Sequence, residues 1–164
     1  MSTVRALLRE LVLADVRFIV VGGVAVVMHG YLRATKDLDL VIDLSAPEAR
    51  KALQVMLDAG LRPTVPVNAL DFADPSIRQS WIEEKNMLVF QMCDPKDARR
   101  NVDLFVEAPM DFEQMWARAV RLRIDDVVVP VAAIRDLIAM KQSAGRPQDL
   151  DDIAQLEKLE GLRD

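Results

Sequence analysis

The fold is decided by the stretch Phe18-Ile19-Val20-Val21-Gly22-Gly23, followed after thirteen further residues by Asp37-Leu38-Asp39-Leu40-Val41-Ile42. The β-branched run over residues 18–21 predicts a short buried strand that ends at the glycine pair. Residues 24–29 predict a short helix, and residues 38–42 predict a second strand. The chain thus passes from a strand through two glycines into a helix, and then returns to a strand.

Two carboxylates stand at alternate positions at the start of the second predicted strand. Because alternate side chains of a strand face the same side, Asp37 and Asp39 project together, while Leu38 and Leu40 face the other way. Adjacent carboxylates repel each other and raise each other's pKa unless a cation lies between them. A hard divalent metal with oxygen ligands removes that repulsion, and Mg²⁺ (or Mn²⁺) is the usual choice beside phosphates.

A third acid lies in another apolar segment. Asp103 stands between Val102 and Leu104 in a strand predicted over residues 102–106, where packing alone does not call for a carboxylate. If this strand pairs beside the strand of Asp37 and Asp39, the three carboxylates form a cluster able to hold two metal ions. We therefore predict Asp37, Asp39 and Asp103 as metal ligands and as catalytic residues.

The glycine pair and the loop before the acids supply a second half of the predicted site. Gly22 and Gly23 allow backbone N–H groups to approach a phosphate closely, and the N-terminus of the following helix favours negative charge. Arg33 and Thr35 directly precede the acid pair and are predicted to contact triphosphate oxygens. Taken alone, a glycine pair is more often a tight turn, and Arg33 is equally consistent with a loop cation.

Together these motifs resemble the signature of the nucleotidyltransferase superfamily, which is a glycine pair followed by an acid-x-acid pair, with a third acid on a later strand. Three segments are similar to the minimal bacterial AbiEii-type and related toxin-like branch: Gly22-Gly23-Val24-Ala25, His29-Gly30 and Arg33-x-Thr35-x-Asp37-Leu38-Asp39. The segments 136–141 and 145–153 are similar to that branch too. The likeness spans about residues 18–156, although residues 44–98 carry no family motif.

Lys141 shares the apolar stripe of its predicted helix, so it either extends to the surface or meets a buried anion. The resemblance implies a lysine near the nucleotide phosphates at this position. Asp149 and Asp152 follow in the next helix, and one of them is expected to anchor Lys141 or Arg146; the sequence leaves the choice open.

The predicted architecture is α+β (mixed α/β): a mixed β-sheet flanked by helices, with a C-terminal helical segment. We expect one domain over residues 1–164, with a core over about 16–131 and C-terminal helices over about 132–160. The further helices are predicted over residues 3–14, 47–59, 110–117, 132–144 and 148–159, and the further strands around residues 77–82, 87–92, 119–124 and 127–131.

Composition sets the outer limits. The chain has 164 residues, 51% of them hydrophobic, and a net charge of -5, which fits a globular protein and not a disordered one. The longest uncharged run, residues 18–32, is too short to span a membrane, so we expect a cytoplasmic protein without membrane contact. The acidic balance disfavours a large non-specific nucleic-acid surface.

The resemblance implies an enzyme that transfers a nucleoside monophosphate from an NTP to a hydroxyl acceptor and releases pyrophosphate. The toxin-like branch implies an RNA or protein acceptor in a toxin–antitoxin or phage-defence setting, with a cognate antitoxin as partner. A small molecule such as an antibiotic is the alternative acceptor, and the net charge favours it slightly. A catalytically silent binding module is a further alternative, against which the intact acids argue.

Overall fold

A computed structural model of the chain describes residues 2–163, with side chains described for residues 4–161. The elements in chain order are α1 (Ser2–Leu13), β1 (Phe18–Val21), α2 (Gly22–Met28), β2 (Leu38–Ile42), α3 (Ala46–Asp58), β3 (Arg62–Pro63), the 3₁₀ helix η1 (Ala69–Ala73), α4 (Pro75–Lys85), β4 (Val89–Asp94), β5 (Asp97–Phe105), α5 (Phe112–Arg118), β6 (Val120–Ile124), β7 (Val127–Val131), α6 (Ile134–Ala144) and α7 (Pro147–Arg163).

The strands form one seven-stranded sheet in the order β3-β4-β5-β2-β1-β7-β6. All four side chains of β1 are fully buried, as the β-branched run predicts for a strand near the centre of a sheet. β1 pairs antiparallel with β2 and parallel with β7, and β2 pairs parallel with β5. The sheet is therefore mixed, which confirms the predicted α/β architecture.

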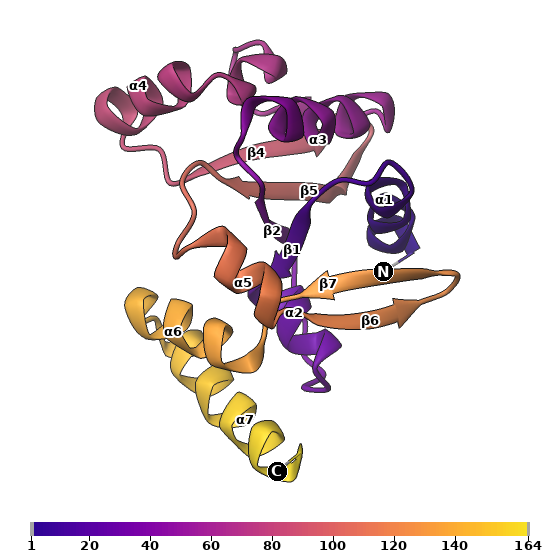
Figure 1. Ribbon diagram of the computed structural model, residues 1–164, viewed down its shortest axis with the longest axis vertical. Coiled ribbons are helices and arrows are strands. Elements are labelled where there is room, and N and C mark those ends of the chain that lie inside the picture. Colours follow the sequence, from indigo (N-terminus) through magenta and orange to yellow (C-terminus); the bar gives the residue numbers. More distant parts are fainter. Residues whose placement is uncertain (1, 164) are drawn as a thin grey trace.

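The two faces of the sheet carry different helices. α1 contacts β7 and α3, and α3 contacts β2, so these two helices cover one face. Leu38 lies on that face, beside Val4 and Leu7 of α1. Along the longest axis of the molecule, α3 and α4 lie at one end and the α6–α7 pair lies at the other, with α5 between them (Figure 1). Asp39, which is next to Leu38 in β2, therefore faces the opposite side of the sheet, toward α6.

The strand predicted around residues 77–82 is wrong, because this segment lies inside helix α4. Asp74 caps the helix by accepting hydrogen bonds from the backbone N–H groups of Ser76 (2.8 Å) and Ile77 (3.4 Å), and Pro75 occupies its first turn. The buried Arg78 and Trp81 are three positions apart, which is the spacing of one helix face. The Asp-Pro start signal therefore outweighs the β-branched content.

Most other predicted elements are confirmed to within a few residues. β1, β2 and β7 have the predicted bounds, and Gly30 follows α2 with a φ of 119°, as expected of a helix-ending glycine. The short strand β3 and the helix η1 were not predicted. Throughout residues 2–163, every helix falls short of the length and apolar character that membrane crossing requires.

Candidate active site

The register of the central strands brings the predicted acids into one row. Val21, the last residue of β1, pairs with Asp39 of β2. Asp39 pairs in turn with Asp103 of β5, and Asp103 pairs with Gln91 of β4. Side chains directly opposite one another on neighbouring strands lie on the same face of a sheet. The glycine pair, the second acid and the third acid therefore follow one another across three strands.

Gly22 and Gly23 sit so close to this row that no side chain fits at either position. A Cβ atom on Gly22 would collide with Oδ2 of Asp39, and one on Gly23 would collide with Oγ1 of Thr35. Gly22 also has a φ of 67°, in the left-handed region that favours glycine. The pair thus allows the start of α2 to lie directly against Asp39, with Thr35 and Arg33 beside it.

A cavity of about 810 Å³ lies next to Gly22, between the sheet and helix α6, whereas Gly23, Arg33 and Thr35 are not among its described lining residues. Asp37, Asp39 and Asp103 all contribute to its wall, which confirms that Asp37 and Asp39 face the same side and that Asp103 joins them. Gly22 and Lys141 line the same cavity. The remaining lining residues are Val21, Leu88, Val89, Phe105, Pro109, Met110, Leu137, Ala139, Met140, Ser143, Ala144, Arg146 and Asp149.

The carboxylates in the cavity carry more negative charge than their surroundings neutralise. Burial is the largest cause that raises the pKa of Asp39, and together with the nearby charges of Asp103 and Asp37 it brings this pKa to about 7, against the opposing effect of Lys141 and Arg146. Burial also raises the pKa of Asp103, although a hydrogen bond from Nε2 of Gln91 (3.0 Å) acts in the other direction. Oδ1 of Asp37 is buried without a hydrogen-bond partner among the described residues.

This donor set fits a hard divalent cation. The three carboxylates are half-buried, one oxygen of Asp37 has no hydrogen-bond partner among the described residues, and the pKa of Asp39 is strongly raised. A cation bound between them would remove both features, because it would neutralise the carboxylates. Within residues 2–163, however, no three His, Cys, Asp or Glu side chains already form a metal-binding cluster. The metal and the ligand roles of Asp37, Asp39 and Asp103 therefore remain predictions.

Lys141 meets a buried anion, and that anion belongs to the protein. Nζ of Lys141 donates to Oδ2 of Asp152 at 2.8 Å. The side chain of Asp152 is fully buried, and it also accepts hydrogen bonds from Arg33 (2.9 and 2.8 Å) and from Gln148 (3.0 Å). Burial alone would raise the pKa of Asp152, but the hydrogen bonds from Arg33 and Lys141 lower it overall.

The buried Asp149 of α7 forms a second ion pair, with the largely exposed Arg146 that directly precedes this helix. It accepts a hydrogen bond from Nε of Arg146 at 2.7 Å, and Nζ of Lys141 lies 3.6 Å from its other oxygen. The sequence left open which of the two acids anchors Lys141 or Arg146. In the structure, Asp152 anchors Lys141 and Arg33, and Asp149 chiefly anchors Arg146. Helix α7 is therefore part of the wall behind the cavity.

Sequence reasoning missed several residues of this site. Gln91 was not singled out, although a polar residue alternating with Phe90 and Met92 in a strand was a usable signal. The apolar lining residues Leu88, Phe105 and Met110 come from segments that carry no motif, and only the folded topology brings them to the cavity.

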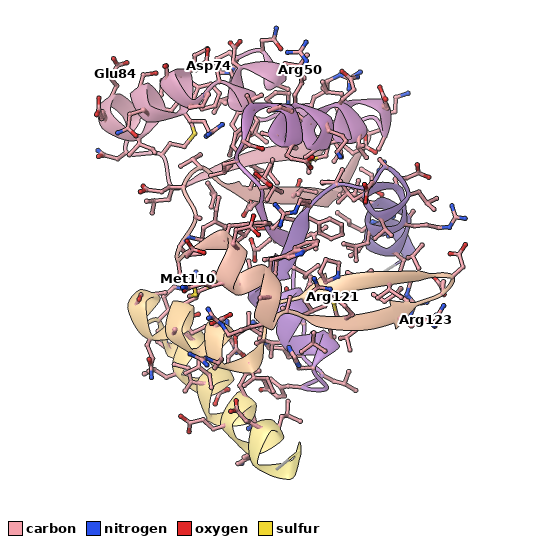
Figure 2. All side chains as sticks on the ribbon, viewed as in Figure 1. Arg50, Asp74, Glu84, Met110, Arg121 and Arg123 are labelled. Atoms are coloured by element: carbon pink, nitrogen blue, oxygen red, sulfur yellow. The ribbon has the colours of Figure 1, made fainter. Side chains whose placement is uncertain are left out.

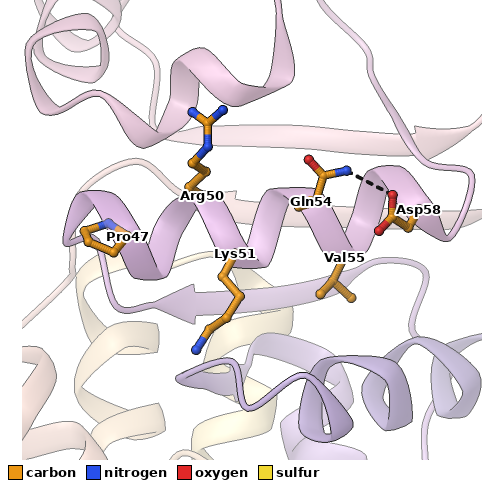
Figure 3. A pocket seen from close by; sticks show the side chains of 6 residues that line it. All are labelled: Pro47, Arg50, Lys51, Gln54, Val55 and Asp58. Atoms are coloured by element: carbon orange, nitrogen blue, oxygen red, sulfur yellow. Dashed lines mark hydrogen bonds between the residues drawn. The ribbon is translucent and has the colours of Figure 1, made fainter.

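A second hollow, of about 350 Å³, has a different character. It is lined by Pro47, Arg50, Lys51, Gln54, Val55 and Asp58, all from helix α3 (Figure 3). Gln54 donates to Asp58 along the helix at 2.9 Å. Because every side chain comes from one helix surface, no groups from different elements converge there, and we assign it no chemistry.

A mixed sheet that joins a glycine pair after one strand to acids on the next two strands defines the fold class of the nucleotidyltransferases. The chain belongs to the family described as "Nucleotidyltransferase of unknown function (DUF6036)", whose profile matches residues 2–160. A comparison with curated proteins gives no sequence match. The more specific AbiEii-type resemblance is not confirmed by these comparisons.

Solved structures share the fold at low sequence identity. The lincosamide antibiotic adenylyltransferase LnuA, bound to lincomycin, has a TM-score of 0.66 at 15% identity and covers 97% of both chains. An antigenic nucleotidyltransferase-like protein from Paracoccidioides brasiliensis has a TM-score of 0.61 at 16% identity, covering 96% of this chain and 75% of that one. ANT(2")-Ia in complex with adenylyl-2"-tobramycin has a TM-score of 0.59 at 14% identity, covering 96% and 90%.

Proposed function

We propose that the protein transfers a nucleoside monophosphate from an NTP to a hydroxyl acceptor and releases pyrophosphate. The observation that carries the proposal is the sheet register, in which Val21 pairs with Asp39 and Asp39 pairs with Asp103 beside the glycine pair. Membership of a nucleotidyltransferase family supports the same reaction class. The cavity volume of about 810 Å³ falls within the range of about 300–1,000 Å³ that is common for ligand pockets.

Asp37, Asp39 and Asp103 are the residues proposed to hold Mg²⁺ or Mn²⁺. When bound, such a cation neutralises triphosphate charge and lowers the pKa of an acceptor hydroxyl. The orphaned oxygen of Asp37 and the raised pKa of Asp39 support this assignment, because both describe carboxylates that lack a neutralising partner.

The phosphates are proposed to lie against the start of α2. There, Gly22 and Gly23 present backbone rather than side chains, and Thr35 and Arg33 lie beside Gly23. Lys141 lines the cavity while Asp152 holds its ammonium group, so its position is set before a nucleotide arrives. A preset cation stabilises developing charge without reorganising during the reaction.

In the proposed step, the acceptor oxygen forms a bond to the α-phosphorus while the bond between that phosphorus and the oxygen bridging to the β-phosphorus breaks. The pyrophosphate leaves with the bonding electron pair. The hydroxyl proton passes to Asp103, directly or through a water molecule, and from there to solvent.

Two acceptor classes follow from different observations. The motif resemblance favours an RNA or protein acceptor in a toxin–antitoxin or phage-defence role, with an antitoxin partner. The shared fold of LnuA and ANT(2")-Ia, whose structures contain lincomycin and adenylyl-tobramycin, favours a small molecule.

Calorimetry tests the nucleotide site independently of the acceptor. A non-hydrolysable NTP titrated into the full chain should bind only when Mg²⁺ or Mn²⁺ is present. Asp39→Asn should weaken that binding at least about tenfold, because one metal ligand loses its charge. Equal binding in EDTA would overturn the metal assignment. No nucleotide binding under any condition would overturn the proposed function and favour a silent binding module.

A further inference from the structure

The row of site residues has a direction across the sheet. Gly22 follows β1, Asp39 lies on β2 and Asp103 lies on β5, so the proposed phosphate site and proton acceptor stand at opposite ends. On the side of Asp103 away from the proposed phosphate site, the next strand of the sheet is β4. Whatever the hydroxyl acceptor is, its body has to lie in this further part of the cavity.

That part of the cavity is apolar. Val89 of β4 pairs with Phe105 of β5, and Phe105 stands two residues beyond Asp103 on the same face of the strand. Leu88, Met110 and Met140 line the same cavity, and Figure 2 shows Met110 next to α6. We call these five residues, Leu88, Val89, Phe105, Met110 and Met140, the apolar wall.

The apolar wall includes side chains that the fold itself does not use. Leu88 is 80% exposed and Val89 is 38% exposed, although both are large hydrophobic residues. The backbone of Leu88 is nevertheless held in place, since its carbonyl accepts a hydrogen bond from the backbone N–H of Val106 at 3.2 Å. Exposed apolar surface that lines a cavity beside polar groups is typical of a ligand-binding surface.

The charges of the cavity disfavour a polyanionic acceptor. Four carboxylates line it, from Asp37, Asp39, Asp103 and Asp149, against two cations. Of these two cations, Lys141 is proposed above to contact the nucleotide phosphates, and the largely exposed Arg146 is paired with Asp149. A nucleic-acid backbone needs several unpaired cations along its path, and the lining residues of this cavity do not supply them.

Resting on the proposed transferase function, we propose that the acceptor is a neutral small molecule with an apolar ring or chain body. The body packs on the apolar wall and presents a hydroxyl group to Asp103. Two residues along a strand span about 6.6 Å, so a body extending from Asp103 to Phe105 is the size of a fused ring system. Nucleotide transfer then joins the acceptor oxygen to the α-phosphorus, releases pyrophosphate, and passes the hydroxyl proton to Asp103.

Naphthalene-ethanol, a neutral fluorescent alcohol, is a direct probe of this site. We expect it to bind saturably to the full chain preloaded with Mg²⁺ and a non-hydrolysable NTP, so that the alcohol and the nucleotide are held together. Leu88→Ser should raise its dissociation constant at least about fivefold, since the apolar contact is lost. With Mg·ATP, naphthalene-ethanol should accelerate pyrophosphate release more than glycerol or a short single-stranded RNA does.

Leu13→Ser is the matched control, because it removes the same apolar group from an exposed position at the end of α1 that does not line the cavity. Its effect on probe binding should stay within about 1.5-fold. Equal effects of the two variants, displacement of the probe by nucleotide, or pyrophosphate release driven by RNA alone would each overturn the inference. A chain that binds no nucleotide fails the proposed function instead, which the calorimetric titration detects separately.

Discussion

At the scale of single residues, Asp39 is the cavity residue whose ionised form the fold disfavours most clearly. It lies against the start of α2, where even a methyl group on Gly22 would collide with it, and it faces two further carboxylates. Its pKa is raised from an ordinary 3.8 to about 7 because burial and like charge disfavour its ionised form. The native state therefore contains a group whose ionisation opposes folding until a cation binds.

We predict that Asp39→Asn stabilises the metal-free protein in a pH-dependent way. A raised native pKa means that the native state holds a proton that the unfolded state has released, so wild-type stability falls as pH rises from about 4 to about 7. Asparagine stays neutral throughout. The melting temperature of the Asp39→Asn protein should exceed that of wild type by about 3 °C or more at about pH 8, and by less at about pH 5.

Thermal melts in EDTA at both pH values measure this difference. Asp151→Asn, on the exposed side of α7, serves as the control and should show no such pH dependence. Added Mg²⁺ should narrow the gap by stabilising wild type more than Asp39→Asn. A variant that melts below wild type at the higher pH would contradict the electrostatic account.

Lys141→Met tests two roles of this lysine: its ion pair with Asp152 and its proposed contact with the nucleotide phosphates. The sequence alone predicts little loss of stability, because methionine packs where the lysine stem packs. The structure changes that expectation, since Asp152 loses one of its cations while keeping Arg33. We expect a loss of about 2 kcal/mol in urea unfolding, together with at least about a tenfold fall in NTP turnover. Unchanged turnover in the folded variant would refute a phosphate role.

At the scale of elements, α7 acts as a brace for the loop that precedes β2. Asp152 of α7 receives both Arg33 from that loop and Lys141 from α6. We predict that Asp152→Ala destabilises the protein by about 3–5 kcal/mol, because it leaves two cations without their buried partner. Asp152→Asn, which keeps the shape and loses the charge, should cost less.

Urea unfolding with hydrogen exchange measures the effect and its location. Exchange should accelerate in residues 31–37 and in α6, which depend on Asp152, and not in α3. Asp151→Asn again provides the control, and its stability should stay within about 0.5 kcal/mol of wild type. Uniform acceleration across the chain would indicate general destabilisation rather than a local brace.

The elements also show what the sequence could predict. β1 and β2 were predicted with their correct bounds, because a β-branched run before two glycines and an alternating acid pair are local signals. Helix α4 was missed, because Asp74 and Pro75 were not read as a cap and first turn. The sequence narrowed the partner of Lys141 to Asp149 or Asp152, and the structure shows Asp152. The apolar wall and the contact of Arg33 with Asp152 join distant segments, and no local pattern encodes them.

At the scale of the whole molecule, the acidic character of the cavity agrees with the net charge of -5. We predict that the chain binds a single-stranded RNA of unrelated sequence only weakly, with a dissociation constant above about 100 µM at about 0.15 M salt. Fluorescence anisotropy with a labelled RNA measures this value. Tighter, salt-sensitive binding would require a basic surface and would return RNA to the acceptor candidates.

The pairing of Arg33 with Asp152 spans 119 positions of the chain. During synthesis on the ribosome, the strands that carry Asp39 and Asp103 emerge well before α7 does, so the loop of Arg33 lacks its counter-ion until Asp152 has been made. A nascent chain therefore contains the clustered acids of β2 and β5 before it can form the ion pair between Arg33 and Asp152.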